Sequence, residues 1–178
     1  MTRPTTLRAQ PHARDQEVRE MNTVRVSIVE LEGAALDWAV ARATKAWEWA
    51  HRLFPTMTLD STFKDAIACS YPRGEFGSSL PTCVLVPNNS MRQDPRPFCP
   101  STEWEHGGPL IAELGIHLVP AGLCGWDAAL EINKHQAKWN RQWEWIGGDN
   151  ETPLIAACRA LVLNKIGDEI EIPKELMP

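Results

Sequence analysis

The chain has 178 residues, of which 43% are hydrophobic and 23% are charged, so its composition is that of a folded globular protein. The 18 Lys and Arg against 23 Asp and Glu give a net charge of −5, which argues against a general binder of nucleic acid or membrane surfaces. No apolar run approaches the roughly 20 residues that span a bilayer, and residues 1–20 contain no apolar signal core. We therefore expect a cytoplasmic protein.

The five cysteines show neither the C-x-x-C spacing of a zinc site nor the even count of a disulfide framework. We therefore expect reduced thiols and neither a metal nor a cofactor. Residues 1–20 contain almost no large apolar side chains, so they cannot bury enough surface to offset the entropy of ordering. The sequence predicts a flexible tail over residues 1–20 and a single domain over residues 21–178.

Residues 23–28 alternate apolar and polar side chains, which predicts a half-buried strand. The period then changes, and small or apolar residues recur at steps of three and four, which predicts a helix over residues 34–53 that ends before Pro55. Residues 55–100 contain seven of the 14 prolines, so we expect a long irregular region with one strand at residues 82–86.

Gly107 and Gly108 precede Pro109, which suits the first position of a helix, so a short helix is predicted to begin at this point and end at Gly115. Strands are expected at residues 116–119, around Trp126 and at residues 143–146. The last helix is predicted over residues 152–166, between a capping Thr152 and Gly167, and an extended segment follows at residues 170–173. The predicted fold class is α+β, with two main helices packed on a small antiparallel or mixed sheet.

Four segments in this order resemble the NinX-like family of phage and prophage proteins. They are ALDWAVA at residues 35–41, PSTEWEHGGPLI at residues 100–111, TPLIAACR at residues 152–159 and GDEIEIP at residues 167–173. The resemblance extends from Met21 to about Leu176, and the 20 preceding residues and the Trp-rich basic stretch at 134–144 depart from it. It implies a phage protein in a bacterial cytoplasm, with an accessory or counter-defence role, and no particular reaction.

The segment around Gly107 and Gly108 is the first candidate site. Glycines at a helix start expose backbone N–H groups to an anion, neighbouring hydroxyls add donors, and a Trp stacks on a flat ligand. The predicted ligand-binding residues are Ser101, Thr102, Trp104, Gly107, Gly108 and Pro109. The alternative is a tight structural turn in which Trp104 fills the core, because the segment lacks a P-loop lysine and a dinucleotide fingerprint.

The second candidate is a partner-binding surface, because eight Trp among 178 residues is an excess and Trp is enriched at protein interfaces. Trp139, Trp143 and Trp145 lie close to Lys134, Lys138 and Arg141. The alternative is that these indoles pack against neighbouring elements. The Trp excess and the alanine-rich helix also suit a homo-oligomer.

Catalytic motifs are absent from the sequence: neither H-E-x-x-H nor G-x-S-x-G occurs, and the acidic residues flanking the last helix suit solvated positions. The leading hypothesis is a non-enzymatic phage accessory protein that captures a small anionic, nucleotide-like ligand and so sequesters a host immune signal. The alternatives are a protein–protein inhibitor of a host factor and an enzyme that acts on a nucleotide. Nucleic acid and membranes are not expected as partners.

Overall fold

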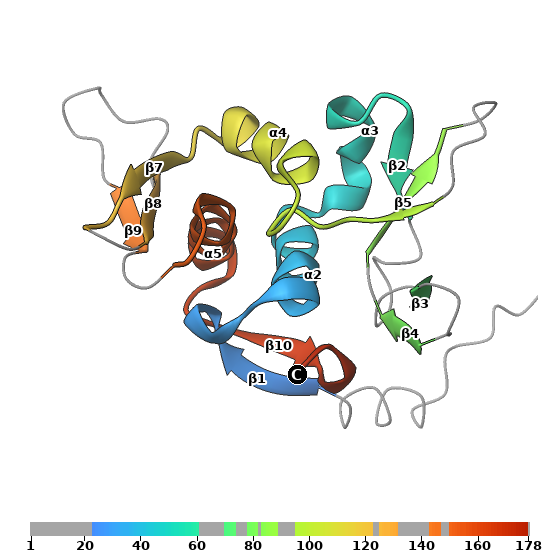
Figure 1. Cartoon of the computed structure of the whole chain (residues 1–178), viewed down its shortest axis with the longest axis horizontal. Coiled ribbons are helices and arrows are strands. Elements are labelled where there is room, and N and C mark those ends of the chain that lie inside the picture. The colour runs from blue at the N-terminus through green and yellow to red at the C-terminus, as the bar shows by residue number, and fades with distance from the viewer. Residues whose placement is uncertain are drawn as a thin grey trace, which may run out of the picture.

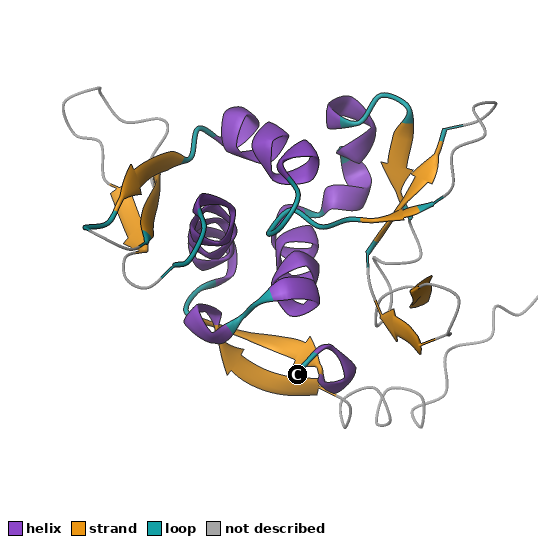
Figure 2. Cartoon of the chain, viewed as in Figure 1, coloured by secondary structure: helices purple, strands orange, loops and turns teal. Residues whose placement is uncertain are grey.

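The computed structural model describes residues 23–60, 70–73, 78–81, 83–88, 95–122, 125–131, 143–146 and 150–177. Three helices of at least 11 residues and four small antiparallel sheets form within these ranges (Figures 1 and 2). The α+β class is therefore confirmed. The strands are divided among four sheets instead of forming one, and the predicted tail at residues 1–20 lies outside the described residues.

The helical elements are η1 (Ile28–Glu30), α2 (Gly33–Thr44), η2 (Ala46–Glu48), α3 (Ala50–Leu53), α4 (Trp104–Leu114), α5 (Pro153–Ile166) and η5 (Lys174–Leu176). The first sheet pairs β1 (Thr23–Ser27) with β10 (Glu169–Pro173), and the second has the order β2 (Met57–Leu59), β5 (Val84–Pro87), β6 (Arg96–Pro97). The third pairs β3 (Ser70–Arg73) with β4 (Ser78–Pro81), and the fourth has the order β7 (His117–Pro120), β8 (Trp126–Glu131), β9 (Trp143–Ile146).

Helix α5 lies at the centre of the molecule, beside α2 and below α4 in the view of Figure 1, with β8 and β9 against another side. Its residues from Ala156 to Val162 are all buried, so the middle of the helix is enclosed on every side. Three of these seven residues are alanines, whose small side chains let neighbouring elements approach closely. The helix therefore forms the centre of the core that α2, α4 and the β7–β8–β9 sheet surround.

The predicted ends of α5 are confirmed. The Thr152 hydroxyl accepts a hydrogen bond from the Ile155 N–H at 3.2 Å, Pro153 takes the first helical position, and Gly167 follows the last turn with φ 121°. These determinants are local, since each lies within three residues of the helix end that it defines.

Arg159 is a buried cation of α5, 7% exposed, that ties three segments together. Its Nε and Nη2 donate to the Leu31 carbonyl at 3.2 and 3.1 Å, and its Nη1 donates to Asn150 Oδ1 at 2.9 Å. Asn150 Nδ2 in turn donates to the Trp126 carbonyl at 2.9 Å. Burial lowers the pKa of the guanidinium, and the nearby Glu32 and Glu151 oppose that shift.

The helix predicted over residues 34–53 ends early, at Thr44. Lys45 adopts the left-handed conformation (φ 50°, ψ 51°), and its N–H bonds the carbonyls of Ala41 and Arg42, which closes α2. The chain continues through η2 and α3 instead. Ala46 and Ala50 still enter the same core, at 0 and 1% exposure. Two short helical turns therefore bury the apolar residues that the spacing assigned to one long helix.

The second correction concerns α4, which begins at Trp104 and contains Gly107, Gly108 and Pro109 inside it. The first turn forms earlier than predicted because the Glu103 carbonyl accepts hydrogen bonds from His106 N at 3.0 Å and Gly107 N at 2.9 Å. Residue 107 is a glycine because of close packing and not because of a turn. A Cβ at this position would lie 2.4 Å from the Pro100 carbonyl oxygen and 2.7 Å from a methyl carbon of Leu154.

Residues 55–100 hold more regular structure than the single predicted strand. That strand corresponds to β5, which pairs with β2 and β6, and the β3–β4 hairpin lies between β2 and β5 in the sequence. Phe98, which follows β6, is buried at 1% exposure and connects this sheet to the main core. The Pro-rich region thus contributes to the core through its described strands.

Candidate functional site

The predicted ligand-binding segment divides into buried and exposed residues. Ser101 and Gly107 are buried, Gly108 and Pro109 are partly buried inside α4, and Thr102 and Trp104 are exposed, Trp104 at 57%. Trp104 therefore does not fill the core. The role of the six residues in ligand binding stays a prediction.

The N-terminus of α4 is also acidic. Glu103 is the N-cap residue and Glu105 lies in the first turn, where both complement the positive end of the helix. Arg96 contacts Glu105 at 3.2 Å with both side chains largely exposed. An anion approaching this helix start would meet two carboxylates, so the local charge disfavours the predicted anion site.

Ser101 and His106 hold this segment to the core. The Ser101 N–H donates to Asp37 Oδ1 of α2 at 2.8 Å, and Asp37 is only 4% exposed. His106 Nδ1 accepts from the Cys99 N–H at 3.1 Å. Among the described residues, Ser101 Oγ and His106 Nε2 have no hydrogen-bond partner. The Ser101–Asp37 bond therefore holds the turn before α4 to α2.

The His106 ring packs against Phe54 and Phe98, with both ring centroids 5.8 Å from its own. Burial lowers the pKa of His106, and Arg96 lowers it further, while Glu105 and Glu103 act in the opposite direction. The neutral imidazole is thus favoured in the folded protein. This environment is that of a packed core histidine at a helix start.

The predicted tryptophan surface is described only in part. Trp139 lies outside the described residues, and only the backbone of Trp143 is described, in β9. Trp145 is 52% exposed and pairs with Ala129, which pairs with His117, so these residues share one face of the β7–β8–β9 sheet. Val119 lies on the same face and is 43% exposed. The opposite face packs on α5.

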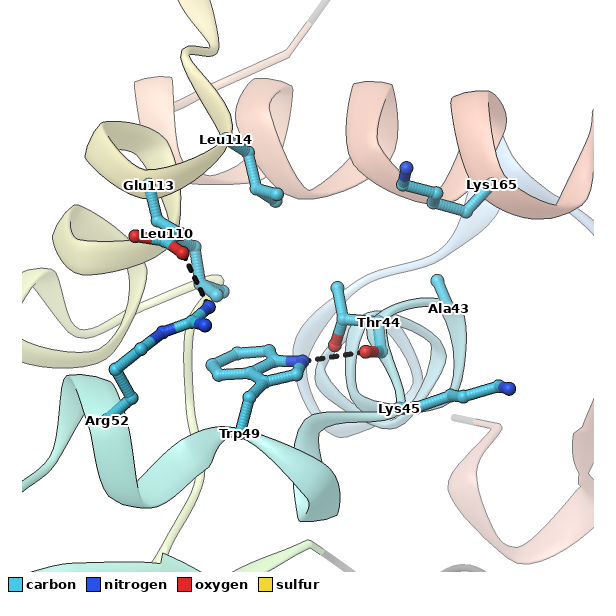
Figure 3. A pocket seen from close by; sticks show the side chains of 9 residues that line it. All are labelled: Ala43, Thr44, Lys45, Trp49, Arg52, Leu110, Glu113, Leu114 and Lys165. Atoms are coloured by element: carbon cyan, nitrogen blue, oxygen red, sulfur yellow. Dashed lines mark hydrogen bonds and ion pairs between the residues drawn. The ribbon is translucent and has the colours of Figure 1, made fainter.

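A different pocket, which the sequence did not predict, lies where the C-terminal ends of α2, α4 and α5 meet α3 (Figure 3). Its volume is about 410 Å³, within the usual range of small-molecule sites. Nine residues line it: Ala43, Thr44, Lys45, Trp49, Arg52, Leu110, Glu113, Leu114 and Lys165. We call it the Trp49 pocket.

Trp49 supplies a fixed aromatic surface in this pocket. Its Nε1 donates to the Thr44 carbonyl at 2.7 Å, a group that the end of α2 leaves unsatisfied. The Thr44 hydroxyl donates to the Val40 carbonyl at 2.8 Å. Leu110 and Leu114 of α4 line the same pocket (Figure 3). The indole is thus oriented by a hydrogen bond on one edge and keeps its ring beside the open volume.

The pocket carries three cations and one carboxylate. Arg52 of α3 forms an ion pair with Glu113 of α4 at one end, and the Lys165 side chain extends from α5 toward the open space, whereas Lys45 points away from it (Figure 3). Lys45 and Lys165 also lie beside the C-terminal ends of α2 and α5, whose dipoles attract cations. An aromatic ring flanked by cations is suited to a planar anionic ligand.

Sequence reasoning missed this pocket because its lining comes from residues 43–52, 110–114 and 165, which no local motif connects. One signal was present: Trp49 lies off the alanine stripe of the predicted helix and so does not belong to its buried face. Within the described part of the chain, no group of three or more His, Cys, Asp or Glu is placed to hold a metal ion. None of the described helices combines the length and the apolar character that a membrane crossing requires.

A comparison with curated proteins gave no match. A family model described as Bacteriophage P22, NinX matches residues 27–165. The match spans every residue that lines the Trp49 pocket, from Ala43 to Lys165, as well as the segment around Gly107. It confirms the resemblance found in the sequence. Because the matched region is well over half of the chain, the protein belongs to the phage NinX family.

Proposed function

We propose that this phage accessory protein acts by binding a small anionic ligand with a planar ring in the Trp49 pocket. The observation that carries the proposal is the oriented indole of Trp49 beside Arg52 and Lys165. Stacking on an aromatic side chain contributes about 1–3 kcal/mol per base, and ion contacts add to it. A nucleotide combines both features, so it remains the ligand class that the geometry supports best.

Binding without turnover fits the lining of this pocket. Its nine residues include no His, Cys or Ser, and its one carboxylate, Glu113, is paired with Arg52. Such a set can hold and orient an anion. A protein that binds a host nucleotide signal in this way lowers the free concentration of that signal, which is the sequestration role proposed from the phage setting.

Titration calorimetry of the purified protein with nucleoside monophosphates and cyclic nucleotides tests the proposal. We expect heat for at least one of them, and loss of that heat in K165E, which reverses a charge at the pocket. K174E is the matched control, because Lys174 is also exposed and lies in η5, outside the lining of the pocket. Equal binding by both variants, or no heat with any nucleotide at high protein concentration, would refute the proposal.

The second candidate function is docking of a host protein on the outer face of the β7–β8–β9 sheet. The observation that favours it is the joint exposure of Trp145 and Val119 on that face, at 52 and 43%. A host-lysate pull-down with W145A should then lose a stoichiometric partner that wild type retains. W104A removes an equally exposed indole from α4 and serves as the control. Retention of the partner by W145A would contradict this function.

A further inference from the structure

The Arg52–Glu113 ion pair in the Trp49 pocket indicates which planar ring the pocket selects. Arg52 comes from α3 and Glu113 from α4, and the pair lies at one side of the Trp49 ring (Figure 3). Their side chains are 59 and 41% exposed, so a ligand on the indole can reach both. From this pair we infer that the planar ring is a guanine base of a free nucleotide, an inference that rests on the proposed function.

Each residue of the pair plays a single hydrogen-bonding role. A guanidinium only donates, and an ionised carboxylate only accepts. Side by side, they present a donor next to an acceptor that has room for two N–H groups. Glu113 Oε1 accepts from Arg52 and keeps one lone pair, and Oε2 keeps both, so each oxygen can accept one N–H of a ligand. A complementary base must offer one acceptor next to two adjacent donors.

Guanine has this pattern on one edge, where the O6 acceptor is followed by the N1–H and N2–H donors. O6 would accept from Arg52 while Glu113 accepts from N1–H and N2–H, which makes three charge-assisted hydrogen bonds. Adenine and cytosine offer one amino donor and one ring acceptor to the same pair, and uracil offers one acceptor and one N–H. Each of these three bases therefore makes one bond fewer.

Lys165 lies at another side of the pocket, where its side chain extends toward the open space from α5 (Figure 3). A base stacked on Trp49 with its donor edge toward Glu113 would direct its sugar and phosphate away from the ion pair, and Lys165 is the cation that remains for that phosphate. The pocket thus separates base recognition, by Arg52 and Glu113, from phosphate recognition, by Lys165.

Calorimetry with GMP, IMP and AMP on the full chain tests the inference. IMP keeps O6 and N1–H but lacks the N2 amino group, so it isolates one bond to Glu113. A charge-assisted hydrogen bond is worth enough to change affinity by roughly tenfold or more, so GMP should bind at least tenfold more tightly than IMP. AMP should also bind at least tenfold more weakly than GMP.

The variant E113Q should abolish the preference for GMP and bring the three dissociation constants within about threefold of one another, because the neutral amide removes the double acceptor. E105Q is the matched control. Glu105 is also an exposed carboxylate of α4 that pairs with an arginine, Arg96, yet it lies outside the pocket. The preference for GMP should survive in E105Q, and circular dichroism of both variants checks that the fold is retained.

Three results would overturn the inference, and they separate it from the proposed function. If the three nucleotides bind equally and K165E loses this binding, the anion pocket is supported but guanine selection is refuted. No binding of any nucleotide refutes both. A guanosine oligonucleotide that competes more strongly than GMP refutes the assignment to a free nucleotide, because the net charge of −5 predicts that a longer phosphate chain is repelled.

Discussion

Gly107 and Gly108 are adjacent glycines inside α4, and the structure predicts opposite effects for alanine at the two positions. An alanine in a helix interior is favoured over glycine by about 0.5–1 kcal/mol. At Gly108 a new Cβ would have its nearest contact with a Trp104 ring carbon at 3.7 Å, an ordinary van der Waals distance. G108A should therefore stabilise the protein by about that amount.

At Gly107 the same methyl group would meet the Pro100 carbonyl oxygen at 2.4 Å and a Leu154 methyl carbon at 2.7 Å. The first of these is backbone of the turn that leads into α4, so it cannot move away as a flexible side chain can. Overpacking of this kind costs about 1–3 kcal/mol, and two simultaneous contacts place G107A at the upper end. After subtraction of the helix-propensity gain, G107A should be about 2 kcal/mol less stable than wild type.

Urea unfolding followed by circular dichroism measures both variants. Because the propensity gain is common to them, the difference between G107A and G108A, about 3 kcal/mol, reports the steric contact alone. Thermal unfolding should show the same order, with a gap of roughly 10 °C for a chain of this length. Equal stabilisation in both variants would show that residue 107 has room for a side chain and that α4 does not contact Pro100 as described.

Three further predictions concern buried polar groups. D37A leaves the buried Ser101 N–H without its acceptor and should cost about 1–3 kcal/mol in urea unfolding; an unchanged midpoint would exclude that bond as a stabilising contact. R159M removes three hydrogen bonds and leaves the buried Leu31 carbonyl without a donor, so it should lower the free energy of unfolding by about 3 kcal/mol in the same assay. An unchanged free energy of unfolding would show that these bonds contribute no net stability. Burial lowers the pKa of His106 below 6.5, so the unfolded state takes up a proton that the folded state resists, and stability should fall as the pH drops below about 6.5. H106N can keep the bond from Cys99 and should show a weaker loss between pH 6.5 and 5; identical pH profiles would mean that another group titrates.

The predictable part of the fold is the part with local determinants. Helix α5 was predicted to within one residue because Thr152, Pro153 and Gly167 act on the turns beside them. Strands β1, β7 and β9 were predicted to within one residue at each end from alternation and turn residues, and the extended segment expected at residues 170–173 forms β10. In each of these cases the decisive residues are neighbours in the sequence, so no tertiary information was required.

The errors arose where tertiary contacts decide. An alanine stripe predicts one helix over residues 34–53, but Lys45 ends α2, and the Trp49 indole then satisfies the Thr44 carbonyl. Gly107 has the signature of a helix start, yet its lack of a side chain serves a contact with Pro100 and Leu154. The same limit explains the missed pocket, whose lining residues come from three separate stretches of sequence.

The pairing of β1 with β10 has a consequence for the order of events during synthesis. Thr23 is paired in register with Pro173, so nearly the whole described chain lies between two adjacent strands. A ribosome that has produced β1 must complete α5 and β10 before β1 finds its partner. Such a long-range contact closes late and slowly, and until then one strand edge remains open to other chains. The growing protein is therefore most prone to aggregation before its last helix and strand emerge.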